Sequence, residues 1–346
     1  MTSERELIAR TRQRLRDLLR PESDFLWVII IYGIAISLLT LAVPVAVQFL
    51  INTIVNIGSF RAVAVLSLTL LLILMASGAL SALRLWAVEL YERRIFARLT
   101  GEISYRVALA SSDHFEGHKK GSSNRYFEVL LQQKNIPFIM LDGFAFVLQA
   151  VVGFTLVSFY HPWLFAFNVV IGIAIYAIWK VWSTGAKASA IQHSKQKYLT
   201  AHWLEGLENE PGESLKQDRI AELAAGTDAH VNNFIASQRA HFSFTYPQSL
   251  MFLALYAFGS SGLLGLGGWL VIQSVLSVGQ LVAAELVMAS IFLGLSRFST
   301  YLKDYYELYG AADKLGDLLS LPVMESNADI SAEGPAESDA AEERLR

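Results

Sequence analysis

The sequence contains no cysteine and has little charge, because Asp, Glu, Lys and Arg together make up only 17% of its 346 residues. The lack of cysteine excludes disulfide bonds and thiolate chemistry. The scarcity of charge, combined with a hydrophobic content of 53%, excludes an ordinary soluble domain of this size. Composition alone therefore predicts a membrane protein.

Four long stretches contain no charged residue at all, and they span residues 25–60, 62–83, 143–179 and 240–284. A helix needs roughly 20 apolar residues to cross a bilayer. The last two stretches would form helices of about 60 Å if they were unbroken, which is twice the hydrocarbon thickness. Each of these two is therefore expected to hold two spans.

Turn residues fall where these spans should end. The triplet HPW at 161–163 divides the third stretch, and the glycines from Gly262 to Gly268, with residues 274–279, divide the fourth. The segment NIGSFR at 56–61 closes the first hairpin. The expected fold is an all-α membrane protein with six transmembrane helices.

Positive charge is confined to one side of this arrangement. Of the 28 lysines and arginines, only Arg61 falls on the other side. This bias predicts cytoplasmic N and C termini. The first 24 residues are charged and lack the apolar core of a cleavable signal peptide, so the first span is expected to act as its own insertion signal. We expect a multi-pass protein of the inner (plasma) membrane.

The segment 1–24 is predicted to be an amphipathic helix that lies in the membrane interface. Its apolar side carries Leu7, Ile8, Thr11, Leu15, Leu18 and Leu19. Arginines occupy the rest of its surface, where they would contact lipid phosphates, and Pro21 ends the helix. The alternative is a solvated basic tail.

Two cytoplasmic segments, 84–137 and 180–243, are too short to bury a core of their own and contain few residues that break helices. Read as a helical extension, residues 84–109 would reach about 39 Å. Both segments are therefore expected to be long helical hairpins that project from the membrane and end in polar tips, at 110–124 and 207–218. Such projections add no stability to a membrane protein, so we expect the tips to dock on a soluble molecule.

Two stretches of the sequence resemble a known family. FEGHKKGSSNRYFEV at 115–129 is similar to the first coupling segment of type I ABC exporters. Residues 277–322, with VGQLVAAEL and an A-x-x-K-L-x-x-L-L-x-x-P ending, are similar to their sixth span and exit helix, nearest to the branch that exports peptides and proteins. The resemblance covers residues 5–322. It implies an elbow helix, a six-span domain over residues 25–322, hairpins that end in coupling helices, and a domain-swapped dimer.

The sequence departs from this family after Pro322, where a fused ATPase domain would begin and only 24 residues remain. Residues 323–346 are expected to form a disordered acidic tail. A P-loop run, G-x-x-x-x-G-K-[ST], is also missing. The chain is therefore expected to be no enzyme on its own and to hold no cofactor, with ATP and Mg²⁺ bound by a separate ATPase subunit.

The resemblance assigns docking of that ATPase to the two tips. The residues expected to make the contact are Asp113, His114, Phe115, Glu116, Gly117, His118, Leu207, Glu208, Pro211, Glu213 and Leu215. The run DHFEGH also offers potential metal ligands, but a polar docking turn is the preferred interpretation and no metal site is predicted. The second tip is acidic, unlike the family pattern, so either the ATPase carries a basic groove or coupling through this tip is altered.

Glu285 is the one acidic candidate inside the membrane, about 18 Å inward of Arg297 along the sixth span. Burying a carboxylate there costs several kcal/mol unless it faces water, has a partner or is protonated. In a functional role it would line the substrate path or carry a proton. In a structural role it would bond to a neighbouring helix.

Two main functions follow from the sequence. The first is the transmembrane subunit of an ATP-driven exporter, which moves an amphipathic cargo (peptide, protein or lipid) out of the cytoplasm by alternating access. Its partners would be a separate ATPase subunit, a second copy of itself or a related transmembrane subunit, and membrane lipids, with no nucleic acid. The alternative is a proton-driven secondary transporter with the same membrane fold, and a non-transporting scaffold is a third.

Overall fold

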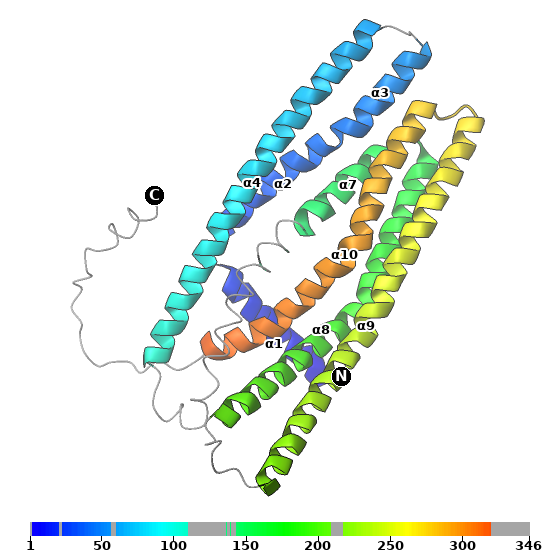
Figure 1. The fold of residues 1–346 in the computed structure, drawn as a ribbon. Helices are drawn as coiled ribbons and strands as arrows, with labels where there is room; N and C mark the ends of the chain where they lie inside the picture. The colour runs from blue at the N-terminus through cyan, green and yellow to red at the C-terminus, as the bar shows by residue number, and fades with distance from the viewer. Residues whose placement is uncertain are drawn as a thin grey trace, which may run out of the picture.

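The computed structural model describes residues 2–20, 23–56, 60–109, 136, 139, 143–208 and 217–319. The elements within these ranges are the α-helices α1 (Thr2–Leu19), α2 (Ser23–Thr40), α3 (Ala42–Asn56), α4 (Phe60–Leu109), α7 (Phe144–Ser158), α8 (Pro162–Glu208), α9 (Gln217–Ile272) and α10 (Val278–Leu319). Figure 1 shows α2, α3 and α4 along one side, α8 and α9 along the other, and α7 and α10 between them.

The helices are those of an all-α, multi-pass membrane protein. Five candidate spans are long and apolar enough to cross a bilayer: Ile30–Ile54, Phe60–Arg106, Pro162–Leu207, Gln217–Ile272 and Val278–Ser296. The apolar helix α7 is shorter, with 15 residues. The six-span arrangement counts α7 as a span, and that count stays a prediction.

The first uncharged stretch contains two helices because proline interrupts it. Leu41 separates α2 from α3, and Pro44 follows three residues later. Proline has no N–H to donate to the carbonyl of Thr40, and its ring would collide with that carbonyl in an unbroken helix. The next residue, Val45, makes the ordinary helical bond from its backbone N–H to the carbonyl of Leu41, at 3.2 Å.

The predicted turn at HPW is confirmed. Helix α7 ends at Ser158, and α8 begins at Pro162, where the missing N–H of proline removes no helical hydrogen bond. The side chain of His161 caps the new helix, because its Nδ1 accepts a hydrogen bond from the backbone N–H of Trp163 at 3.2 Å.

Only part of the turn predicted for the fourth stretch forms, because α9 runs through Gly262–Gly268 to Ile272. Two glycines of this helix instead allow close packing. Gly259 lies against the ring of Phe292, and Gly267 lies against Leu281. In each case a Cβ atom would collide with a side chain of α10, so these glycines bring α9 and α10 together.

The chain turns at 273–277, which confirms the part of the prediction that rested on residues 274–279, and a capping motif lies at each end of the turn. Ser274 adopts a positive φ of 59°. The N–H of Val275 bonds to the carbonyl of Leu270 at 3.1 Å, as in a Schellman motif. Ser277 and Gln280 then exchange side-chain to backbone hydrogen bonds of 2.9 and 3.1 Å, which form a capping box that starts α10.

Two hydrophobic clusters form the core. The first joins α7, α8, α9 and α10 around side chains such as Phe252, Met288 and Phe292. The second lies where α1, α4, α8 and the C-terminal half of α10 meet, around side chains such as Leu99 and Leu315. Burial in the second cluster fixes the positions of the helices that extend beyond the uncharged stretches.

The predicted N-terminal helix forms α1, and its apolar side packs on protein. Ile8, Thr11 and Leu15 are buried. They belong to the face that contacts α10 and α8. The guanidinium Nη1 of Arg14 bonds to both the carbonyl oxygen (2.7 Å) and the Oδ1 (3.1 Å) of Asp313, which attaches α1 to α10.

Candidate functional site

Three helices continue without a break beyond the stretches that lack charge. Helix α4 extends from Arg84 to Leu109, α8 from Lys180 to Glu208, and α9 begins at Gln217, ahead of the stretch that starts at Ala240. At 1.5 Å per residue these extensions reach about 39, 44 and 35 Å. The predicted helical extensions are therefore present.

The structure tests little of the predicted docking tips. Asp113, His114, Phe115, Glu116, Gly117, His118, Pro211, Glu213 and Leu215 lie outside the described residues. Leu207 and Glu208 end helix α8, where Leu207 is half-buried. The docking role of both tips stays a prediction.

The far ends of α8 and α9 are joined through Trp203. Its indole Nε1 donates to Thr227 Oγ1 at 3.1 Å, and its ring stacks on His230 with centroids 5.1 Å apart. Gly226 faces this ring so closely that a Cβ atom would lie 2.5 Å from it. The two limbs of the hairpin are thus joined through contacts that need glycine at 226.

Two serine–histidine pairs join the same helices nearer the membrane. His241 Nδ1 lies 2.9 Å from Ser189 Oγ, and His193 Nδ1 lies 3.1 Å from Ser237 Oγ. Each serine also donates its only hydroxyl proton to a carbonyl of its own helix. Each hydroxyl oxygen must therefore accept a proton from the histidine, so Nδ1–H is the neutral tautomer of both rings.

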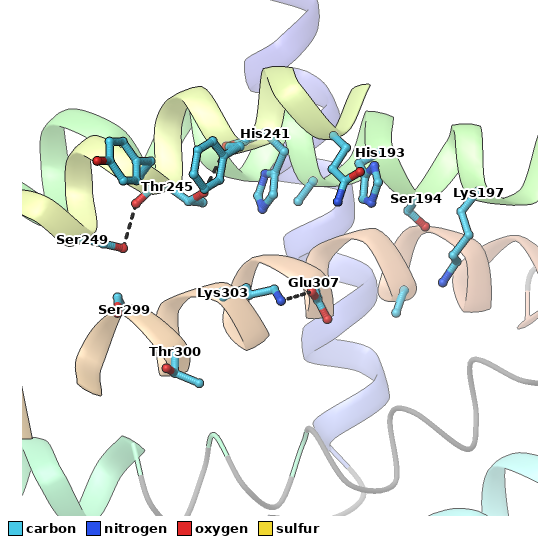
Figure 2. A pocket seen from close by; sticks show the side chains of 15 residues that line it. His193, Ser194, Lys197, His241, Thr245, Ser249, Ser299, Thr300, Lys303 and Glu307 are labelled. Atoms are coloured by element: carbon cyan, nitrogen blue, oxygen red, sulfur yellow. Dashed lines mark hydrogen bonds and ion pairs between the residues drawn. The ribbon is translucent and has the colours of Figure 1, made fainter. Parts of the chain in front are cut away.

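This tautomer leaves the Nε2 atom of each imidazole as an unprotonated acceptor. Nε2 of His241 is buried and has no hydrogen-bond partner among the described residues. The rings of His193 and His241 are nearly parallel, with an interplanar angle of 6° and centroids 6.4 Å apart. Both histidines line one cavity, where their rings point from α8 and α9 toward α10 (Figure 2).

The cavity has a volume of about 500 Å³ and lies between α8, α9 and α10. Its polar and charged lining comprises His193, Ser194, Lys197, Gln238, His241, Thr245, Ser249, Ser299, Thr300, Lys303 and Glu307. Lys303 and Glu307 approach each other to 3.8 Å. Phe242 and Tyr246 supply aromatic surface and stack on each other with centroids 5.0 Å apart.

A buried lysine holds α8 against α10 beside this cavity. Lys187 is only 5% exposed. Its ammonium lies over the rings of Trp179, Tyr305 and Tyr309, at 5.5, 5.2 and 5.1 Å from their centroids. Cation–π attraction to three rings stabilises the charge after its removal from water.

The C-terminal half of α10 also carries titratable groups with shifted pKa values. Burial raises the pKa of Tyr306 to about 12, and its hydroxyl donates to Gln248 Oε1 of α9 at 3.1 Å. Burial, followed by the nearby charge of Glu307, raises the pKa of Asp304. An ionised Asp304 is therefore disfavoured by its surroundings.

Glu285 lies on α10 within the candidate span Val278–Ser296. Its Oε2 is buried and makes no hydrogen bond to any residue that the structure describes. The bond to a neighbouring helix that a structural role would require is therefore not found for this atom. Glu285 does not line the histidine cavity, and its role inside the membrane stays a prediction.

Sequence reasoning missed the two histidines, although a signal was present. The pattern Ser-x-x-x-His occurs as Ser189 to His193 in one limb and as Ser237 to His241 in the other. Residues four apart lie on the same face of a helix. In antiparallel limbs each serine then meets the histidine of the opposite limb, which is the arrangement observed.

No family model matches the sequence, and no curated protein matches it.

Proposed function

We propose that the chain is the transmembrane subunit of an ATP-driven exporter of the type I ABC architecture, whose ATPase is a separate polypeptide. The observation that carries the proposal is the continuity of α8 and α9, which form one long hairpin joined through Trp203 near its end. A stiff, internally joined hairpin transmits force between a membrane domain and a soluble partner. The resemblance of residues 115–129 and 277–322 to that family supports the same role.

In this proposal, two copies of the chain, or this chain and a related one, form a domain-swapped dimer in the inner membrane with cytoplasmic N and C termini. ATP and Mg²⁺ bind to the ATPase subunits. Their closure moves the hairpin tips, and because α8 and α9 are joined, the hairpin moves as a rigid body and reverses access to the cargo. The cargo is an amphipathic peptide, protein or lipid.

Co-purification tests this proposal. The full chain is purified with the soluble ATPases encoded beside it, and ATP hydrolysis is measured with and without replacement of residues 112–122 by a Gly-Ser linker of equal length. We expect the replacement to abolish co-purification. The matched control replaces residues 57–59 in the predicted outer loop, which should leave co-purification intact. Equal retention of the ATPase by both variants would contradict the proposal.

Proton-driven transport is a second candidate, favoured by the acceptor Nε2 atoms of His193 and His241 and by Glu285 Oε2, which has no partner among the described residues. These groups are sites where a proton can bind. Transport in vesicles that continues without ATP, stops with a protonophore and is lost in Glu285→Gln would support this candidate. Transport that requires ATP and withstands the protonophore would exclude it.

A further inference from the structure

We infer that the cavity between α8, α9 and α10 binds an amphipathic anion with a carboxylate or phosphate head, and that His193 and His241 take up protons when it binds. The inference concerns the chemistry of the cavity and does not depend on the partner ATPase. It can therefore be tested on the chain alone.

The charge of the lining selects an anion. Lys197 and Lys303 are the cations of the wall, and Glu307 is its one carboxylate. Lys303 lies 3.8 Å from Glu307, so this pair is partly neutralised. By formal charge the lining holds two cations and one carboxylate, so it is net positive even when both histidines are neutral. A cationic ligand would meet two ammonium groups, whereas an anionic head gains attraction from both.

The histidines couple this binding to protons. With Nδ1–H held by serine, Nε2 is the atom of each ring that is left to bind a proton, and both histidines line the cavity. A lone pair repels an anionic oxygen, whereas a protonated Nε2 donates a charge-assisted hydrogen bond to it. Anion binding therefore favours protonation of the rings, and by linkage protonation favours anion binding.

The charged and titratable groups around the two rings also affect how readily the histidines take up protons. Lys197 faces them from α8, Tyr246 from α9, and Lys303, Glu307 and Tyr306 from α10. Burial is the main factor that disfavours protonation of both rings in the empty cavity. The lysines add to it, Glu307 opposes it at His193, and a bound anion offsets both burial and the lysines. Among the described residues, no group of three or more metal-ligating side chains occurs. With both Nδ1 atoms engaged and the ring centroids 6.4 Å apart, the two Nε2 atoms also lie too far apart to chelate one ion.

The aromatic end of the cavity selects an amphiphile. Phe242 and Tyr246 are 58% and 54% exposed, although they stack on each other. They lie inside the uncharged stretch that begins at Ala240, whereas Lys197 and Glu307 lie outside such stretches. The cavity therefore offers apolar surface toward the membrane and charge away from it. An anionic head with an apolar or aromatic body matches both ends.

Fluorescence titration with dansylglycine tests the inference. This probe carries a carboxylate and an aromatic body, and it is titrated into the full chain in phosphatidylcholine nanodiscs, with empty nanodiscs subtracted. We expect its affinity to rise between about pH 7.5 and pH 5.5, by up to about tenfold per pH unit for each proton taken up. The uncharged amide dansylglycinamide should bind at least about tenfold more weakly at the lower pH. Equal binding of the two probes would overturn the inference.

Competition identifies the source of the natural head. Inorganic phosphate alone and phosphatidic acid added to the nanodisc are each tested for displacement of dansylglycine. Displacement by phosphate alone indicates a soluble anion as ligand, and displacement only by phosphatidic acid indicates a lipid headgroup. Failure of both to displace the probe would contradict a general anion site.

Variants separate the histidines from the rest of the cavity. His193→Asn with His241→Asn keeps a side-chain donor to each serine and removes both Nε2 atoms, so binding should lose its pH dependence. The matching pair of glutamine substitutions places a permanent N–H donor near each Nε2 position, so binding should be as tight at about pH 7.5 as at pH 5.5. A pH dependence that survives both pairs would overturn the role of the histidines.

A charge-removing substitution of the cavity residue Lys303 has a matched control on α8. Lys303→Gln should lower the affinity for dansylglycine by about tenfold at both pH values, because one ammonium group is lost. Lys195→Gln removes the same charge from an exposed position outside the cavity and should leave binding unchanged. Equal effects of the two substitutions would show that the probe responds to overall charge and would contradict a site at this cavity.

Discussion

The charged half of α4 (residues 84–109) and the α8–α9 hairpin are extensions of similar reach that are held in different ways. Contacts between its own two limbs hold the hairpin, through Trp203 and the two serine–histidine pairs. Helix α4 is held instead by a stripe that packs on other elements, formed by Tyr91, Ile95, Leu99 and Ile103. The two limbs of the hairpin are thus joined to each other as well as to α10, whereas the described part of α4 packs on α2, α3 and α10.

The two halves of α4 also differ from each other in how deeply their side chains are buried. The stripe repeats every four residues and is at most 7% exposed, which is the pattern of a helix with one buried face. The most apolar window of the same helix has no buried residue. Among the described residues, the fully buried side chains of α4 therefore lie in its charged half, while α2 and α3 contact the helix without burying its apolar window.

Truncation of the α4 stripe should have the largest effect on stability. Leu99→Ala removes a side chain that is completely buried and should lower the free energy of unfolding by about 2–5 kcal/mol. Leu85→Ala, on the same helix but 66% exposed, should change it by less than about 0.5 kcal/mol. Thermal unfolding of the purified chain in detergent compares the two. Equal losses would show that α4 is not held through this stripe.

The next largest effect should distinguish the hairpin from α4. Gly226→Ala places a Cβ atom against the Trp203 ring and should cost about 1–3 kcal/mol, because the ring has to move away from Thr227. Gly206→Ala, where no atom lies within 4 Å, should instead stabilise α8 by up to about 1 kcal/mol.

Hydrogen exchange measured by mass spectrometry shows which helices the Gly226→Ala substitution destabilises. In Gly226→Ala, faster exchange is expected in peptides from the ends of α8 and α9, with exchange in α4 unchanged. Faster exchange in all three helices would mean that the hairpin is not a separate unit.

Much of the fold could be predicted from the sequence because its strongest signals are local. Uncharged stretches located the apolar helices, and His161 with Pro162 located a turn. The error at Gly262–Gly268 has a physical cause. Glycine marks a turn or a close helix contact, and only the facing residues, here Phe292 and Leu281 near Gly259 and Gly267, decide between the two.

The candidate site was harder to predict because its parts come from three helices. The pairing of His193 with Ser237 requires the register of α8 against α9. The position of Glu307 in the same cavity requires α10 as well. A single residue such as Glu285 is conspicuous in a sequence because a charge in an apolar stretch is rare. His193 and His241 become noticeable only when the repeated four-residue spacing to serine is compared between the limbs.

Loss of the α1 contact should have a smaller effect than either glycine or leucine substitution. Arg14→Met keeps the apolar stem but removes both hydrogen bonds to Asp313, and should lower the free energy of unfolding by about 1 kcal/mol. Arg16→Met changes an exposed arginine of the same helix and should have no measurable effect. Exchange should rise in α1 and the α4 stripe in the first variant, with the ends of α8 and α9 unchanged. Faster exchange in the hairpin would contradict the division of the two regions.

Asp304 should give the smallest effect, and it concerns α10, the helix that both regions contact. Its pKa is raised by burial, so the unfolded chain ionises more readily, and the folded state loses stability as the pH rises from the unfolded pKa through the folded one. Asp304→Asn removes this loss. It should raise the unfolding temperature by about 2 °C at neutral pH and leave it unchanged at about pH 3, where the acid is protonated in both states. Asp228→Asn, at an exposed position on α9, should have no such effect. A lower unfolding temperature of Asp304→Asn at neutral pH would mean that the ionised carboxylate is bonded in the folded protein. Since α10 supports both α4 and the hairpin, hydrogen exchange in Asp304→Asn should be slower in both regions, and to the same extent.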